Sequence, residues 1–280
     1  MDNLFTIKNR IANIKATQKI IQSMRLMSSV KAQKVRVKMT NNRFYWNEAV
    51  KLVNTARNGI FGRHPYIGGR GVKSPAVIVI NGDRGLCGGY NINAGKALTA
   101  FLDEWGGARI VTVGTKARDY CRRRHGELTE HSFTGISENP FYDDAERIAS
   151  IVLDWYDKKE IDQIHIIYTE FRNMLSQTVR TVRLLPFEAA EYAADGRLKC
   201  EIPNRVFFES TVPFYMAAYI YGAVVESSVC EQSARIASMD SAVRNADDMV
   251  EALTLRYNQE RQSAITQELI EIVNGGEAVS

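Results

Sequence analysis

The segment of the sequence best suited to chemistry is a glycine-dense stretch at residues 81–89, Asn-Gly-Asp-Arg-Gly-Leu-Cys-Gly-Gly. It follows a short apolar run at residues 76–80 and precedes a helical pattern from about residue 91 to 105. Glycine-rich turns between a strand and a helix often bind phosphate. The spacing of the glycines shows whether this turn matches a known phosphate-binding motif. The dinucleotide fingerprint Gly-x-Gly-x-x-Gly is not matched by Gly82, Gly85, Gly88 and Gly89.

The phosphate-loop pattern fails as well. The nearest approach runs from Gly89 to Gly95-Lys96, which is one residue too long, and Ala97 lacks the hydroxyl that would bind magnesium. We therefore predict a structural role, in which the glycines let the chain turn sharply beside a neighbouring helix, and nucleotide binding is the alternative. The residues predicted to form this structural glycine loop are Asp83, Arg84, Gly85, Gly88 and Gly89.

The other reactive side chains are scattered along the chain. Cys87, Cys121, Cys200 and Cys230 form no CxxC pair, and the histidines do not cluster with them. We predict no catalytic residue, no metal site and no cofactor. Four free thiols are typical of a reducing compartment.

The middle of the chain alternates strand and helix patterns. Strands are predicted at residues 76–80, 110–113, 164–168 and 177–185, the last as an edge strand, and helices at 91–105, 115–124 and 139–156. This alternation predicts a Rossmann-like α/β domain with a mainly parallel sheet. A connector rich in Gly and Pro at residues 59–75 precedes it.

The C-terminal segment predicts a very long helix, because residues 223–274 contain no Gly and no Pro. Its start is predicted near Pro213. Mostly apolar or small residues recur there at alternating steps of three and four, as in a coiled-coil seam: Val225, Val229, Gln232, Ile236, Met239, Val243, Ala246, Val250, Leu253 and Tyr257. Beyond Tyr257 the pattern is expected to slip and to resume at Ile265, Leu269 and Ile272.

A second long helix is predicted over residues 1–58. Its predicted apolar stripe is Ile7, Ile11, Ile14, Ile20, Ile21, Met24, Met27, Val30, Val35 and Met39. Residues 1–60 carry 12 basic and 2 acidic residues, about +10, whereas residues 206–280 carry 4 basic and 11 acidic residues, about −7. Opposite charge favours pairing of the two helices as an antiparallel intramolecular coiled coil. It also favours a solvated basic face over a nucleic-acid site.

The predicted fold class is therefore α/β, with a long antiparallel coiled coil of the terminal helices and a central Rossmann-like domain. The predicted boundaries are 1–58 for the first helix, 59–75 for the connector, 76–205 for the α/β domain and 206–280 for the C-terminal segment. No apolar run approaches the ~18 residues that a membrane span requires, and no secretory signal is expected.

Three segments together resemble the gamma subunit of F-type ATP synthase. They are residues 17–27, beginning Thr-Gln-Lys-Ile; residues 83–91, Asp-Arg-Gly-Leu-Cys-Gly-Gly-Tyr-Asn; and residues 257–273, with Arg261-Gln262 and Ile265-Thr266-Gln267-Glu268. The resemblance is collinear over essentially the whole chain. It implies a rotor shaft, one copy per complex, that carries torque between the membrane c-ring and the catalytic alpha–beta hexamer and has no active site of its own.

The resemblance also implies partners and contact residues. Expected partners are the alpha and beta subunits, the epsilon subunit and the c-ring, with no nucleic acid. Membrane association is expected only through the c-ring, at the cytoplasmic face of a bacterial plasma membrane. The resemblance places coupling contacts with the beta subunit at Met24, Arg235, Arg261, Gln262, Thr266, Glu268 and Glu271. It places foot contacts with the c-ring at Phe207, Phe208 and Glu209. The alternatives are a coiled-coil adaptor with an α/β head, or a nucleotide-binding enzyme that uses residues 82–89.

Overall fold

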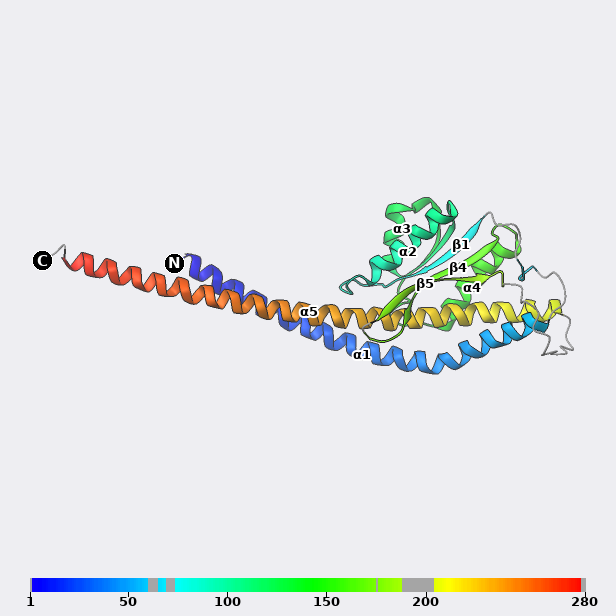
Figure 1. Cartoon of the computed structure of the whole chain (residues 1–280), viewed down its shortest axis with the longest axis horizontal. Helices are drawn as coiled ribbons and strands as arrows, with labels where there is room; N and C mark the ends of the chain where they lie inside the picture. Colours follow the sequence, from blue (N-terminus) through cyan, green and yellow to red (C-terminus); the bar gives the residue numbers. More distant parts are fainter. Residues whose placement is uncertain (1, 60–64, 69–73, 175, 188–203, 278–280) are drawn as a thin grey trace. The chain divides into compact units, whose positions relative to one another are not determined.

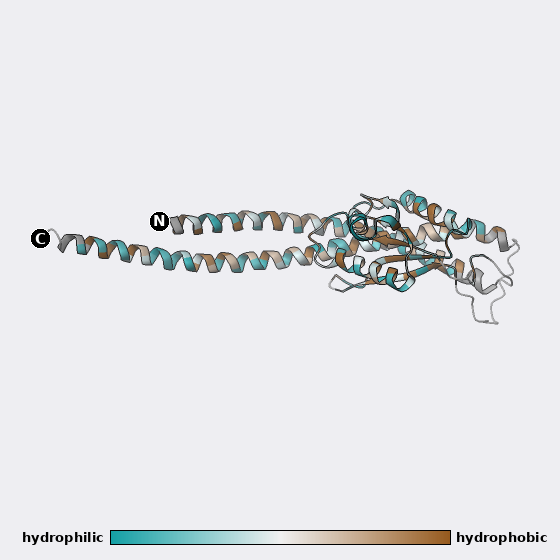
Figure 2. Cartoon of the chain, turned by 90° about the horizontal axis from the view of Figure 1, so that it is seen from above, coloured by the Kyte–Doolittle hydropathy of each residue, from teal (hydrophilic) through white to brown (hydrophobic). Residues whose placement is uncertain are grey.

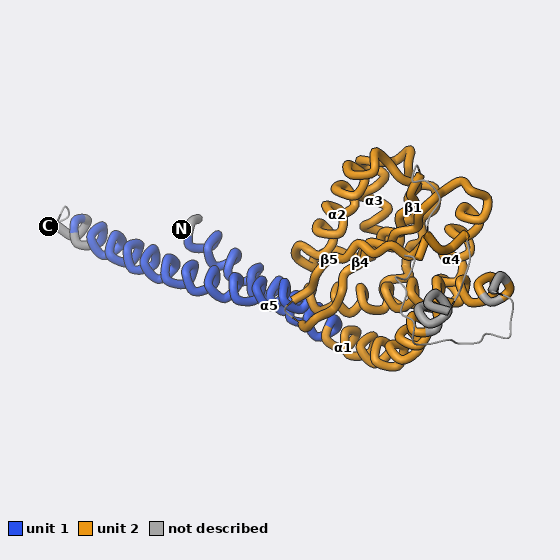
Figure 3. The backbone as a smooth tube through the Cα atoms, turned by 45° about the vertical axis from the view of Figure 1, so that its right-hand side comes forward, with its two compact units in different colours: residues 1–28, 236–280 blue, residues 29–235 orange. Residues whose placement is uncertain are grey.

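The computed structural model describes residues 2–59, 65–68, 74–174, 176–187 and 204–277 (Figure 1). Its helices are α1 (Asp2–Gly59), α2 (Tyr90–Trp105), α3 (Thr115–Arg124), a 3-10 turn η1 (Gly126–Leu128), α4 (Tyr142–Asp157) and α5 (Asn204–Glu277). Its strands are β1 (Pro75–Ile80), β2 (Arg109–Val113), β3 (Thr129–Phe133), β4 (Gln163–Phe171) and β5 (Gln177–Leu185). The chain divides into two compact units, residues 1–28 with 236–280 and residues 29–235 (Figure 3).

The larger unit contains a five-stranded sheet in the order β3-β2-β1-β4-β5. Strands β3, β2, β1 and β4 are parallel neighbours, and β5 pairs with β4 in the antiparallel direction at the edge. The mainly parallel sheet and the edge strand were predicted from the sequence. Strand β3 was not, because its residues Thr-Glu-His-Ser-Phe are mostly polar and exposed and give no apolar run.

Helices cover both faces of the sheet. All six residues of β1 are buried, which explains its continuous apolar run. Ile78 and Ile80 pack in a core with α4 and the first half of α5, whereas Val77 and Val79 pack in a second core with α2 and α3. Figure 2 shows apolar residues along the strands of the sheet. The unit is therefore a three-layer α/β domain with α5 as part of its core.

Helix α5 begins earlier than the sequence predicts. It starts at Asn204, and Pro213 lies inside it rather than at its start. Pro213 is exposed, and the neighbouring turns bury Phe208, Val212 and Met216 in the core of the domain. Proline removes one helical hydrogen bond and costs about 3 kcal/mol in a helix interior. The burial on the inner face explains why the helix continues through Pro213.

In the smaller unit α1 and α5 pair in antiparallel register. Gln18 donates a hydrogen bond to Asp247 at 2.6 Å, and Arg25 forms an ion pair with Asp240 at 2.6 Å. The two contacts are seven residues apart on both helices and run in opposite directions, as a heptad repeat requires. The Arg25–Asp240 pair is partly exposed, so it contributes to the choice of partner more than to stability.

The burial pattern confirms the predicted seam of α5 up to Tyr257 and corrects its end. Beyond Tyr257 the partly buried positions are Glu260 and Ala264, so the spacing of three and four continues without a slip. Ile265, Leu269 and Ile272 are 49%, 57% and 70% exposed. Helical geometry thus sets the seam even where the residue on it is polar.

The predicted stripe on α1 also needs correction. Ile20, Met27 and Val30 are 61%, 59% and 71% exposed and lie off the seam. The buried or half-buried positions that replace them include Gln18, Ser28 and Ala32. Apolar side chains are therefore present on more than one face of α1, and the prediction assigned all of them to the same face.

Among the described residues no helix has an apolar stretch long enough to cross a bilayer. In the same part of the chain no group of His, Cys, Asp and Glu side chains forms a metal site. Cys87, Cys121 and Cys230 are buried free thiols, whereas Cys200 lies outside the described residues. Parts of the predicted 59–75 connector and the end of the predicted α/β segment also lie outside them.

Candidate functional site: the polar joint between the glycine loop and α5

The glycine loop that connects β1 to α2 is held by backbone and side-chain amides at its start. The Asn81 backbone N–H donates to the Val113 carbonyl at 2.8 Å, and the Asn81 side chain donates to the Asn91 carbonyl at 3.0 Å. The Gly82 N–H in turn donates to the side-chain oxygens of Asn81 and Asn91. These bonds fix the first turn of the loop against strand β2 and helix α2.

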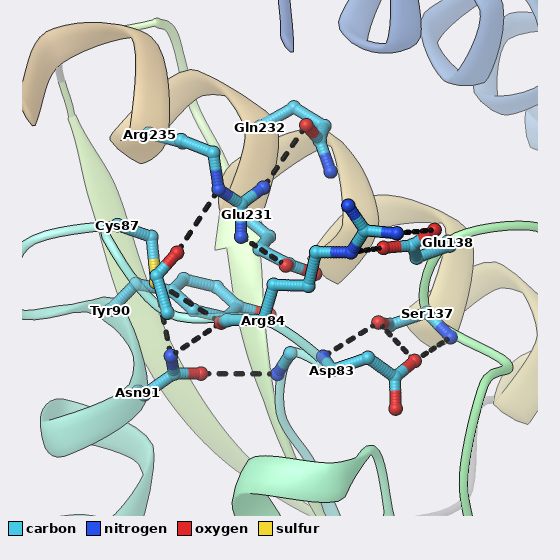
Figure 4. Close-up of polar contacts among 12 residues, drawn as sticks. Asp83, Arg84, Cys87, Tyr90, Asn91, Ser137, Glu138, Glu231, Gln232 and Arg235 are labelled. Atoms are coloured by element: carbon cyan, nitrogen blue, oxygen red, sulfur yellow. Dashed lines mark hydrogen bonds and ion pairs between the residues drawn. The ribbon is translucent and has the colours of Figure 1, made fainter. Parts of the chain in front are cut away.

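Asp83 is the anchor of the loop (Figure 4). Its carboxylate accepts hydrogen bonds from the N–H and hydroxyl of Thr115, at 2.9 and 2.8 Å, and from the Gly135 N–H at 2.9 Å. It also accepts from the N–H and hydroxyl of Ser137, at 3.1 and 2.7 Å. Burial raises the pKa of Asp83, but these hydrogen bonds outweigh burial and hold the pKa below its ordinary value. The ionised carboxylate therefore ties the loop to α3 and to the segment after β3.

We expect Asp83→Asn to destabilise the protein by about 1–2 kcal/mol at neutral pH, because an amide nitrogen would face donors. A depressed pKa in the folded state contributes stability above the unfolded pKa of about 3.9 and loses it as pH falls through the folded value. Urea denaturation of both proteins across the acidic range checks this. The difference should be constant above about pH 5 and shrink below it, and a pH-independent difference would contradict the ionised role of Asp83.

Arg84 extends the same network toward α1. It forms an ion pair with Glu138 in the loop before α4. Glu138 also pairs with Lys31 of α1 at 3.2 Å, and Lys38 donates to the Asn139 side chain at 2.9 Å. The basic face of α1 is thus partly neutralised inside the larger unit by residues of the α/β domain.

The strongest link to α5 is made by Arg235. Its Nη2 donates to Glu231 Oε1 at 2.6 Å, its Nη1 to Gln232 Oε1 at 3.1 Å, and its Nε to the Gly85 carbonyl at 3.1 Å (Figure 4). Arg235 is 5% exposed and Glu231 is 0% exposed. Burial raises the pKa of Glu231, and the bond to Arg235 opposes that shift. A charged pair on one turn of α5 therefore holds the tip of the glycine loop.

The turns of α5 that precede this pair dock on the domain through polar groups. Tyr90 donates to the Ser227 carbonyl at 3.0 Å, and Ser228 donates to the Ser137 carbonyl at 2.6 Å. The Thr169 N–H donates to the Ser227 hydroxyl at 3.1 Å. We call the set of Asp83, Arg84, Gly85, Ser137, Ser227, Ser228, Glu231 and Arg235 the polar joint, because it connects the loop to α5.

The polar joint is poorly suited to bind phosphate. A Cβ added at Gly82 would lie 2.7 Å from the Glu231 carboxyl carbon, so this carboxylate packs directly on the loop backbone. The guanidinium of Arg235 is already engaged by Glu231, Gln232 and Gly85. A phosphate at the loop would be repelled by the buried Glu231 carboxylate, whose own counter-charge on Arg235 is already engaged. The geometry supports the structural interpretation of Gly82.

The residues expected to form coupling contacts are spread over both units. Arg261, Gln262, Thr266, Glu268 and Glu271 are all exposed on α5. Met24 is half-buried in the seam of the smaller unit. Arg235 belongs to the polar joint, so a direct contact with another subunit would require its side chain to leave the bonds that bury it.

The residues expected at the foot also differ in exposure. Phe208 is fully buried in the core with α4 and the sheet, which is a packing role within the chain. Glu209 is exposed on α5. The side chain of Phe207 lies outside the described residues. Glu209 is therefore on the surface of α5, whereas Phe208 packs within the chain.

The loop half of the polar joint was identified from the sequence, whereas in the α5 half only Arg235 was named, and for a contact with another subunit. Glu231 and Ser137 carry no motif of their own. One signal was present: Glu231 and Arg235 are four residues apart, on one face of a helix, within a stretch of mostly apolar or small residues. Charges spaced in this way in a buried segment indicate a pair.

Comparison with known proteins gives consistent matches over the whole chain. A family model described as ATP synthase matches residues 3–279. The ATP synthase gamma chain of Alkaliphilus metalliredigens is 38% identical over 98% of this chain and 97% of its own length. The sodium ion specific ATP synthase gamma chain of Acetobacterium woodii is 32% identical over 100% of this chain and 99% of its own.

Solved structures match the fold. A chain in the Euglena gracilis mitochondrial ATP synthase structure, OSCP/F1/c-ring in rotational state 3, aligns with a TM-score of 0.71 at 18% identity, over 99% of this chain and 95% of the other. A chain in the central stalk/c-ring structure of the Tetrahymena thermophila enzyme aligns with a TM-score of 0.63 at 22% identity, over 80% and 99%. The predicted architecture, with paired terminal helices and a central α/β sheet, is therefore confirmed.

Proposed function

Because the chain belongs to the gamma-chain family of ATP synthase, we propose that it is the central rotor shaft of a bacterial enzyme of this type. It transmits torque between the membrane-embedded c-ring and the catalytic alpha–beta hexamer and performs no chemistry itself. It is a peripheral component of a membrane complex, on the cytoplasmic face. The observation that carries the proposal is full-length similarity at 38% identity to a gamma chain.

The physical features of the chain suit a shaft. A paired helical segment and an α/β domain are parts of one chain, and α5 runs through both compact units. The polar joint and the apolar core fix α5 in the α/β domain, so a torque applied to the domain is passed to the helix. A shaft that binds some conformations of the catalytic subunits better than others shifts their populations as it turns.

The exposed end of α5 is the proposed site of contact with the hexamer. Arg261, Gln262, Thr266, Glu268 and Glu271 lie there beside exposed apolar side chains that have no cover among the described residues. Exposed apolar groups next to charged ones are typical of a surface that meets another protein. We also propose Met24 and Arg235 as residues on which the coupling depends, and Phe207, Phe208 and Glu209 as the region of the foot near the c-ring. The epsilon subunit is the other proposed partner.

Reconstitution with separately purified alpha and beta subunits tests the proposal. We expect a complex that contains one copy of this chain and hydrolyses ATP faster than the alpha and beta subunits alone. Arg122, which is exposed on α3, offers a place for a single labelled cysteine in a Cys200→Ser background, because the described native cysteines are buried. A bead attached there should rotate when ATP is added, and a bead on the beta subunit should not. A complex with unchanged hydrolysis and a stationary bead would indicate a coiled-coil adaptor.

A further inference from the structure

The larger unit contains a cavity of about 340 Å³ that the proposed function does not use. Side chains of α1, β4 and α5 line it, and all of them belong to residues 29–235. Its volume falls in the range of small-molecule sites, about 300–1,000 Å³. The cavity therefore has room for a small organic ligand.

Three aromatic rings form one side of this cavity. The ring of Trp46 lies 4.9 Å from that of Tyr219 and 6.5 Å from that of Tyr168, and the two tyrosine rings are 6.4 Å apart, all as centroid distances. The faces of such rings carry negative potential and attract cations. The close approach of Trp46 to α5 depends on Gly222, where an added Cβ would lie 2.2 Å from the indole ring.

A carboxylate without an ion-pair partner forms another side. Glu226 accepts a hydrogen bond from the Phe171 N–H at 2.9 Å, and among the described residues it forms no ion pair. Burial and the nearby charge of Glu170 raise its pKa, and the hydrogen bond from Phe171 and the charge of Arg43 oppose this shift only in part. Glu170, which also lines the cavity, is instead neutralised by Arg172 and Arg180. Glu226 is thus a half-buried carboxylate whose charge is not offset by an ion pair among the described residues.

We propose that this cavity binds a small organic ammonium cation, with its positive group against Trp46, Tyr168 and Tyr219 and paired with the carboxylate of Glu226. Aromatic faces with one carboxylate suit a soft organic cation, whereas inorganic divalent ions require several oxygen ligands. Arg43 is the cation among the lining residues and opposes the ligand by charge repulsion. The proposal is independent of the rotor function.

Calorimetric titration of the full chain with choline chloride, at constant ionic strength, is the direct test. We expect saturable binding, with the neutral isostere 3,3-dimethyl-1-butanol about tenfold weaker or worse, because it keeps the shape and lacks the charge. Equal affinity for the alcohol would show an apolar cavity only and would overturn the proposal. Absence of saturable binding of choline would overturn it as well.

Matched variants locate the site. Glu226→Gln keeps the hydrogen bond to Phe171 and removes the charge, so it should weaken choline by about tenfold, whereas Glu170→Gln should change affinity by less than about threefold. Trp46→Leu should weaken binding and Arg43→Gln should strengthen it, with circular dichroism and thermal unfolding used to check that each variant is folded. Wild-type affinity in both Glu226→Gln and Trp46→Leu would show that choline binds elsewhere.

Discussion

Glu231→Ala should reduce the free energy of unfolding by about 3–5 kcal/mol, because it leaves the Arg235 guanidinium buried without its counter-charge. Arg235 would keep its bonds to Gln232 and Gly85, but neutral acceptors do not replace a carboxylate at 2.6 Å. Urea denaturation of the full chain, followed by circular dichroism, measures the loss. A change of that size would make the pair the most sensitive part of the polar joint.

Two further variants distinguish the loss of an ion pair from the cost of leaving a charge buried without its partner. Glu48→Ala removes an exposed ion pair with Lys51 on α1 and should cost less than about 0.5 kcal/mol. Replacing both Glu231 and Arg235 with Met should leave stability within about 1 kcal/mol of the wild type, since apolar groups of similar size often replace a buried pair without loss. If Glu231→Ala lowered the free energy of unfolding as little as Glu48→Ala, the Arg235 guanidinium would be hydrated in the variant. The joint as described would then be wrong.

Local patterns in the sequence predicted the regular elements well. Helix α3 was predicted at residues 115–124, where it is found, and the seam of α5 was predicted up to Tyr257, because helical periodicity depends only on neighbouring residues. The start of α5 at Asn204 was missed, because the helix passes through Pro213 with the support of tertiary burial around Phe208. No local rule contains that support.

Within the polar joint, the sequence predicted the glycine loop, which carries a motif, but did not predict the residues that the loop contacts. The glycine loop stands out by composition, whereas its partners Ser137 and Glu231 are distant in sequence and become neighbours through the fold. Gly82 illustrates this limit of prediction from the sequence. The sequence predicts a sharp turn there, but the structure shows that the lack of a side chain leaves room for the Glu231 carboxylate.

Gly222→Ala should destabilise the protein by about 2 kcal/mol, although the same change in an open helix would stabilise it by about 1 kcal/mol. The added Cβ would lie 2.2 Å from Cε3 and 2.7 Å from Cζ3 of Trp46. The indole is held by Tyr219 and Tyr168, so it cannot move aside without losing those ring contacts. Steric overlap therefore outweighs the gain in helix propensity.

The sign of this effect should reverse when the indole is absent. In a Trp46→Ala background, Gly222→Ala removes only the conformational freedom of glycine, and we expect a gain of about 0.5–1 kcal/mol. A double-mutant cycle by urea denaturation measures the coupling, which should be close to 3 kcal/mol, the upper end for residues in direct contact. A destabilising Gly222→Ala in both backgrounds would mean that the packing of α5 on the sheet, rather than Trp46, requires glycine. Reversal would establish that Gly222 is present to let the indole of α1 pack on α5.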